Sequence, residues 1–191
     1  MPAAASTRRQ EAQRNLETIV DAAVEVLGRR PDANMTDVAR ASGLSRQTVY
    51  AHFASREQLI DAAVGRAMDQ AVARIDSVSP DEGRPQDALR RVLDVSWSSV
   101  ATHGALLDAA LSALPPETLH ARHAPVVEPL RRLIERGQRS GAFDPDVPAA
   151  WLLATFFALV HAAGQEVTAG RLEPGAAAAA LRATVPRAFR P

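Results

Sequence analysis

The sequence predicts an all-α fold of about nine helices. Apolar residues recur at helical spacing along nearly all of the 191 residues, and no run alternates between apolar and polar residues over the length of a strand. Hydrophobic residues make up 47% of the chain, which is enough to bury a core, so a disordered protein is not expected.

Four amphipathic helices are expected in the first part of the chain, after an N-terminal arm at residues 1–13 that is expected to be flexible. They span residues 14–27, 35–41, 46–52 and 55–75. Asn34 and Ser45 are typical N-cap residues, and Gly43 suits the left-handed conformation that ends a helix. Residues 14–76 are therefore predicted to form one domain, in which the fourth helix leads to the rest of the chain.

A turn-rich segment at residues 77–85 marks the predicted boundary to a second helical domain, residues 82–191. Its expected helices span residues 89–100, 106–114, 117–139, 147–164 and 174–185. Residues 147–164 carry no formal charge over 18 residues, a length at the edge of what spans a membrane. Their many alanines, with Pro148 and His161, favour a helix covered by protein instead, so no membrane contact is expected.

The composition argues against several classes of protein. The absence of cysteine excludes disulfides, thiolate metal sites and a cysteine nucleophile. The first residues lack an apolar stretch with a cleavage site, so a cytoplasmic location is expected. No nucleophile elbow, Gly-rich phosphate loop or HExxH motif is present, so an enzyme is not expected. His120 and His123 lie three residues apart, but nothing else has zinc-ligand spacing, and neither a metal nor a cofactor is expected.

Residues 34–53 are typical of a helix-turn-helix, since two short helices are joined there by a tight turn that contains glycine. Val49 and Phe53 are four residues apart and point inward. The outward face then carries side chains that can read base edges or hold phosphates: Arg46, Gln47, Thr48, Tyr50, Ala51 and His52. The net charge of zero means that binding to DNA would rest on the local charge of this face.

This part of the chain resembles the tetracycline-repressor (TetR) family over about residues 14–67. The resemblance rests on the order and spacing of four segments: NMTDVA at 34–39, SGLS at 42–45, TVYAHF at 48–53 and REQL at 56–59. It implies a homodimer that places two recognition helices in successive major grooves of a nearly palindromic operator. It also implies that the second domain binds a ligand and forms the dimer, with the last two helices of each copy in a four-helix bundle.

Matching positions in the motif imply a role for individual residues. Phosphate contacts are implied for Thr36, Ser45, Thr48, Tyr50, His52 and Arg56. Arg46 and Gln47 are implied to read base edges, because Arg suits guanine and Gln suits adenine, and Ala51 is placed to meet a thymine methyl group. The alternatives are that Ser45 is only an N-cap, Tyr50 a surface aromatic and His52 a solvated helix end. Positive charge is unfavourable near a helix start, so an external anion explains Arg56 better than helix stability does.

The ligand pocket of the second domain is expected among apolar side chains, which suit a small apolar or aromatic molecule: Trp97, Leu107, Val126, Leu130, Trp151 and Phe156. The alternative for each is a place in an ordinary hydrophobic core. The sequence thus predicts a cytoplasmic, homodimeric repressor that a small molecule releases from double-stranded operator DNA. An activator, or a repressor without a ligand, is the alternative within regulation, and an all-helical enzyme is the alternative outside it.

Overall fold

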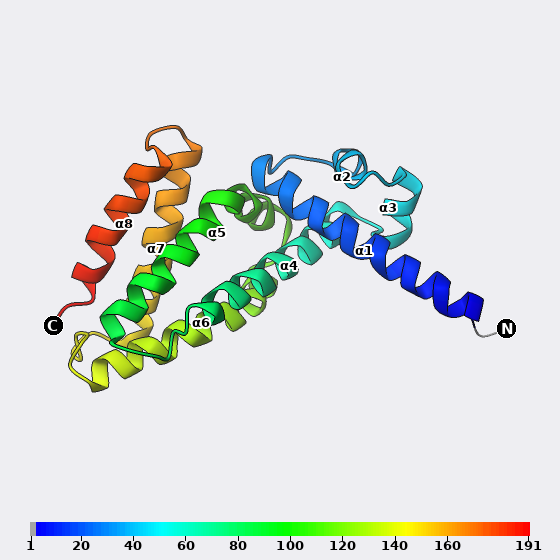
Figure 1. Ribbon diagram of the computed structural model, residues 1–191. Helices are drawn as coiled ribbons and strands as arrows, with labels where there is room; N and C mark the ends of the chain where they lie inside the picture. Colours follow the sequence, from blue (N-terminus) through cyan, green and yellow to red (C-terminus); the bar gives the residue numbers. More distant parts are fainter. Residues whose placement is uncertain (1–2) are drawn as a thin grey trace. The chain divides into compact units, whose positions relative to one another are not determined.

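The structure is a computed structural model that describes residues 3–191, with side chains from residue 6 onward (Figure 1). This described part contains eight α-helices and no strand, so the prediction of an all-α fold is confirmed. The helices are α1 (Ala3–Arg29), α2 (Met35–Ser42), α3 (Arg46–His52), α4 (Arg56–Ser77), α5 (Pro85–Ala113), α6 (Pro116–Arg139), α7 (Ala149–Thr168) and α8 (Pro174–Ala188).

The count is eight instead of nine because the two predicted helices, residues 89–100 and 106–114, meet at a kink and together carry the label α5. Within α5 His103 leaves the helical conformation, with φ −128° and ψ 21°, directly before Gly104. The predicted break between the two helices therefore lies at this kink, with no loop between them.

The N-terminal segment is helical from Ala3, so the first helix begins earlier than the predicted residue 14, and the flexible arm at residues 1–13 stays a prediction. The segment 3–13 consists mainly of Ala, Arg, Gln and Glu, which are strong helix formers, so α1 extends through it without a break. Residues 1–2 of that prediction lie outside the described part of the chain.

The chain divides into two compact units. The first comprises the residues up to Ala67 together with Ala105–Leu119, and the second comprises Met68–Gly104 and His120–Pro191. This division falls inside α4 and not at the turn-rich segment 77–85, because the second half of α4 packs on the core of the second unit through Met68 and Ile75. That residues 14–76 and 82–191 are separate folding domains stays a prediction.

The core of the first unit is formed by the inward faces of α1 to α4. Ile19, Leu27, Val38 and Val49 are almost completely buried, as their helical spacing predicts. Phe53, the C-cap of α3, is buried as well. On the surface of this unit an ion pair of 2.7 Å between Arg66 Nε and Asp21 Oδ1 joins α4 to α1.

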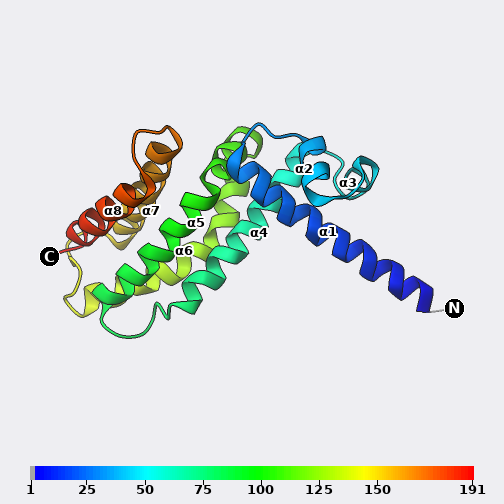
Figure 2. The ribbon, with the colours of Figure 1, turned by 45° about the horizontal axis from the view of Figure 1, so that its top comes forward.

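The core of the second unit joins the second half of α4 to α5, α6, α7 and α8. Helices α7 and α8 lie side by side in both views (Figures 1 and 2). Phe143, in the connection after α6, packs edge-to-face on Phe189 with 5.4 Å between ring centroids. A Cβ atom on Gly137 would lie 2.0 Å from the Phe143 ring, so this close approach requires glycine.

Arginines of α5 and α6 hold the segment 78–84, which follows α4. Arg91 donates to the carbonyl oxygens of Val78, Ser79 and Glu82 over 2.8–3.0 Å. Arg136 donates to the carbonyl oxygens of Gly83 and Pro80 at 2.9 and 3.0 Å. The segment therefore has a defined conformation although its sequence is that of a turn-rich linker.

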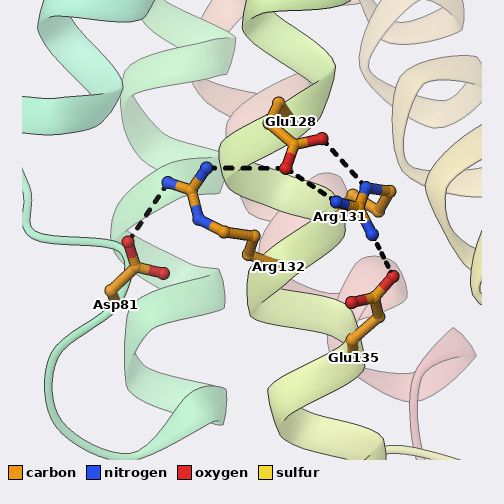
Figure 3. Close-up of polar contacts among 5 residues, drawn as sticks. All are labelled: Asp81, Glu128, Arg131, Arg132 and Glu135. Atoms are coloured by element: carbon orange, nitrogen blue, oxygen red, sulfur yellow. Dashed lines mark hydrogen bonds and ion pairs between the residues drawn. The ribbon is translucent and has the colours of Figure 1, made fainter.

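The same segment is tied to α6 by an exposed chain of ion pairs (Figure 3). Arg132 lies between Asp81 at 3.2 Å and Glu128 at 3.7 Å, and Arg131 lies between Glu128 and Glu135. Exposed ion pairs contribute little stability individually, about 0–1 kcal/mol. The backbone contacts of Arg91 and Arg136 are therefore the more important restraints.

Candidate nucleic-acid interface

Asn34 starts the helix-turn-helix as the N-cap of α2. Its Oδ1 atom accepts hydrogen bonds from the backbone N–H groups of Thr36 at 2.8 Å and Asp37 at 3.2 Å. Asp37 Oδ2 accepts the Asn34 N–H at 3.0 Å, which completes a capping box. This N–H and the guanidinium of Arg30 hold the pKa of the Asp37 carboxyl below its usual value. The first turn of α2 is thus defined by local bonds, and the predicted cap is confirmed.

The turn between α2 and α3 has the conformation that its sequence predicts. Gly43 has φ 70° and ψ 10°, the left-handed region that favours glycine. Ser45 is the N-cap of α3, and its Oγ accepts the Thr48 N–H at 3.0 Å. The two hydroxyl groups of Ser45 and Thr48 also lie 2.8 Å apart. The capping role of Ser45 is therefore present, whereas its contact with DNA stays a prediction.

Helix α3 turns most of the predicted contact residues outward. Val49 faces the core, and the exposed side chains of the helix are Arg46, Gln47, Tyr50 and Ala51. Thr48 and His52 are half-buried at the edges of this face, and Thr36 on α2 is half-buried as well. The face is thus formed by side chains of α3 that are open to a partner.

Tyr50 is exposed over 48% of its surface, and the Arg46 guanidinium lies 6.0 Å from its ring centroid. A cation over an aromatic face at this distance is a favourable arrangement. It orients both long side chains on the outer surface of α3. Tyr50 therefore contacts Arg46 of the same helix, and its side chain stays partly exposed to solvent.

Arg56 has a role that the sequence did not reveal. Its Nε donates to the carbonyl oxygen of Ala33 at 2.9 Å, and its Nη2 donates to the carbonyl oxygen of Pro31. These bonds tie the connection between α1 and α2 to the start of α4. Internal acceptors thus engage two nitrogens of Arg56, which gives the residue a structural role, and a phosphate contact at Arg56 stays a prediction.

A separate cavity that is partly open to solvent lies within the second unit. It is lined by side chains of α4, α5, α6 and α7: Met68, Ala71, Ile75, Val95, Ser96, Ser99, Val100, His123, Val126, Phe157, Val160 and His161. Its walls are mainly apolar, with two imidazoles and two hydroxyls among them.

Of the six residues predicted to line a ligand pocket, only Val126 lines this cavity. Trp97, Leu130 and Phe156 are buried in the core, as the alternative reading allowed. Leu107 belongs to the first unit, and Trp151 is exposed over 67% of its surface. The prediction favoured large apolar side chains, whereas the cavity lies where smaller side chains and histidines face one another. The signals that could have indicated it were His161 in an uncharged helix and the apolar face of the late part of α4.

A capped helix-turn-helix with an exposed reading face, on an all-α chain, defines a DNA-binding transcription regulator. Residues 19–63 match the family model of bacterial regulatory proteins of the tetR family. TtgW of Pseudomonas putida, an HTH-type transcriptional regulator, is 33% identical over 104 residues, which cover 53% of this chain and 67% of TtgW. The chain belongs to the TetR family.

Other relatives extend the likeness over more of the chain. LfrR, an HTH-type transcriptional repressor of Mycolicibacterium smegmatis, is 29% identical over 150 residues, or 78% of this chain and 77% of LfrR. The crystal structure of LfrR in complex with proflavine has a TM-score of 0.73 at 24% identity and covers 94% of this chain and 98% of that one. The fold of the second unit is therefore like that of a TetR-type regulator as well.

Proposed function

We propose that the protein is a homodimeric repressor in the cytoplasm that binds a nearly palindromic operator and leaves it when a small molecule binds. The observation that carries the proposal is the outward face of α3, which presents Arg46, Gln47 and Tyr50 on a helix with caps at both ends. A short helix held in this way fits the major groove, where base edges differ most between base pairs. The protein acts by binding alone and needs no catalytic residue.

In this proposal the contact residues have two roles. Arg46 and Gln47 read base edges, and Ala51 meets a thymine methyl group. The remaining residues hold phosphates and position the helix without reading sequence: Thr36, Ser45, Thr48, Tyr50, His52 and Arg56. The exposure of Arg46, Gln47 and Ala51 supports the first assignment. The net charge of zero means that phosphate binding depends on these side chains and not on a generally basic surface.

The dimer is proposed to form through α7 and α8. In the described part of the chain, α7 is the helix long and apolar enough to cross a membrane, yet Leu152, Phe156 and Val160 on one face are buried in the core of the second unit. Its outer face exposes Trp151 and alanines such as Ala158. A second copy of the chain would cover this face in an isologous four-helix contact, in which small side chains allow close approach. The core contacts of α7 favour this arrangement over a membrane span.

Release by a ligand is supported by the cavity of the second unit and by the structures of relatives. The LfrR structure contains proflavine, and a FadR structure from Bacillus subtilis contains stearoyl-CoA. In this chain Met68, Ala71 and Ile75 line the cavity from α4, and the same helix begins at Arg56, beside the helix-turn-helix. A ligand that prefers the released state about 100-fold supplies about 2.7 kcal/mol toward release.

The first test is salt-dependent binding of the purified protein to the DNA that flanks its own gene, measured by fluorescence anisotropy. The double variant Arg46→Ala/Tyr50→Ala is expected to lose about 2 kcal/mol or more of binding free energy, since it removes a base contact and a phosphate anchor. Arg139→Ala, which removes an exposed arginine of α6, is the matched control and is expected to bind as the wild type does. Unchanged binding by the double variant, with folding intact by circular dichroism, would contradict the assigned interface.

A further inference from the structure

We infer that the cavity of the second unit binds an apolar, ring-bearing molecule that carries one acidic O–H group, a phenol or a carboxylic acid, and that it discriminates against organic cations. This inference rests on the proposed function in one respect, that the molecule would be the ligand of the proposed repressor. It goes further by naming the chemistry of that ligand, from the side chains that line the cavity.

The walls of the cavity favour a flat apolar body. Met68 and Ile75 contribute apolar surface from α4, and Val126 contributes it from α6. On α7 the rings of Phe157 and His161 are stacked, with 6.2 Å between their centroids and 28° between their planes. Both residues line the cavity, so aromatic side chains form part of its wall and favour contact with a ring-bearing ligand. The mainly apolar wall therefore suits a small, flat ring system.

The charges around the cavity disfavour a cation. None of the described residues that line it is an aspartate or a glutamate. The Ser99 hydroxyl donates to the Val95 carbonyl oxygen at 3.0 Å and accepts from Arg74 Nη1 at 2.9 Å, so a guanidinium is bonded directly to the wall. A buried organic cation would lose its hydration without gaining a carboxylate partner. The same positive charge favours a ligand that carries acidic oxygen.

The imidazole of His161 supplies a partner for an acidic O–H group. His123 from α6 and His161 from α7 both line the cavity. Burial, and then the neighbouring His123, lowers the pKa of His161, so its imidazole is neutral near pH 7. A neutral imidazole keeps one nitrogen as a hydrogen-bond acceptor. A phenol can donate to that nitrogen, and a carboxylate can accept a hydrogen bond from the N–H of the other ring nitrogen.

Three probes with one ring system test the inference on the full-length protein: 2-naphthol, 2-naphthoic acid and (2-naphthyl)methylammonium. Isothermal titration calorimetry at pH 7 should give dissociation constants at least about tenfold lower for the two O–H probes than for the ammonium probe. The His161→Leu variant should reduce this ratio to within about twofold, because the acceptor is lost while the apolar wall remains. His120→Leu is the matched control, since His120 is an exposed histidine of α6 outside the cavity, and it should keep the ratio of the wild type.

The comparison of the three probes on the wild-type protein decides the inference even if His161→Leu does not fold. Equal or tighter binding of the ammonium probe would overturn it. So would a ratio that His161→Leu leaves unchanged, or no binding of any probe at about 1 mM. Operator binding is measured on the same preparation. Intact operator binding without probe binding would reject only the ligand class, whereas probe selectivity without operator binding would reject only the proposed repressor.

Discussion

The polar contacts within the helix-turn-helix and those within the second unit differ in the sequence separation of the residues that they join. In the first, the polar contacts of Asn34, Asp37 and Ser45 join residues two or three positions apart. In the second, Arg136 reaches carbonyl oxygens 53 and 56 positions away, and Arg182 pairs with Asp94 across 88 positions. The caps of the helix-turn-helix are thus set by its own sequence, whereas a cavity between distant helices depends on the packing of the whole unit.

The largest expected effect is a loss of packing in the second unit. Gly137→Ala would place a Cβ atom against the buried Phe143 ring, 2.0 Å away before relaxation, and should destabilise the protein by about 3 kcal/mol. Urea unfolding followed by the fluorescence of Trp97 and Trp151 measures it. Gly175→Ala is the control, because a Cβ atom there meets nothing within 4 Å, and it should change stability by less than about 0.5 kcal/mol. Similar urea midpoints for the two variants would contradict the close contact between Gly137 and the Phe143 ring.

A smaller effect is expected in the helix-turn-helix, where the contacts are local. Asn34→Ala removes the acceptor for two N–H groups of α2 and should cost about 1 kcal/mol. Asn34→Ser retains an N-cap of similar strength, so its free energy of unfolding should differ from that of the wild type by only about 0.3 kcal/mol. Thermal unfolding by circular dichroism compares the three proteins. If the alanine and serine variants have the same midpoint, the cap does not support this region.

The smallest effect is a dependence on pH. The Asn34 N–H, and then Arg30, lower the pKa of Asp37 below its ordinary value of 3.8, so the charged carboxylate stabilises the folded state. This contribution is present above pH 3.8 and is lost as the pH falls through the lowered value in the folded protein. The difference in stability between the wild type and Asp37→Asn should therefore shrink below pH 3.8, as measured by urea unfolding at several pH values. A difference that stays constant down to pH 2 or so would assign the effect to hydrogen bonding instead of charge.

The same distinction between local and distant contacts explains what the sequence predicts. The caps at Asn34 and Ser45 and the left-handed Gly43 follow from residue types at fixed offsets, so these features could be predicted and are confirmed. The arrangement of Val49 inward and Tyr50 outward follows from helical spacing. The kink at His103 was predicted as a gap between helices, because the sequence cannot show whether tertiary contacts carry a helix across a glycine.

The cavity could not be predicted because its lining residues come from four helices that are distant in sequence. Trp97 and Phe156 have the size expected of pocket residues, but each lies on the face of its helix that meets the core. Ser96, one position before Trp97, and His161, five positions after Phe156, line the cavity. Successive side chains on a helix point about 100° apart around its axis. Whether a given residue faces the core or the cavity therefore depends on how the helices pack.

The arginines that hold segment 78–84 have a mechanical consequence for α4. They hold the segment that directly follows α4, so we expect any tilt of this helix to pivot near Ser77. With a rise of about 1.5 Å per residue, Met68 lies about 13 Å from this pivot and Arg56 about 31 Å from it. For a rigid helix, a tilt that moves Met68 by about 1 Å moves Arg56 by about 2 Å. A ligand that presses on α4 from the cavity would therefore produce its larger displacement at the end that Arg56 bonds to the connection between α1 and α2.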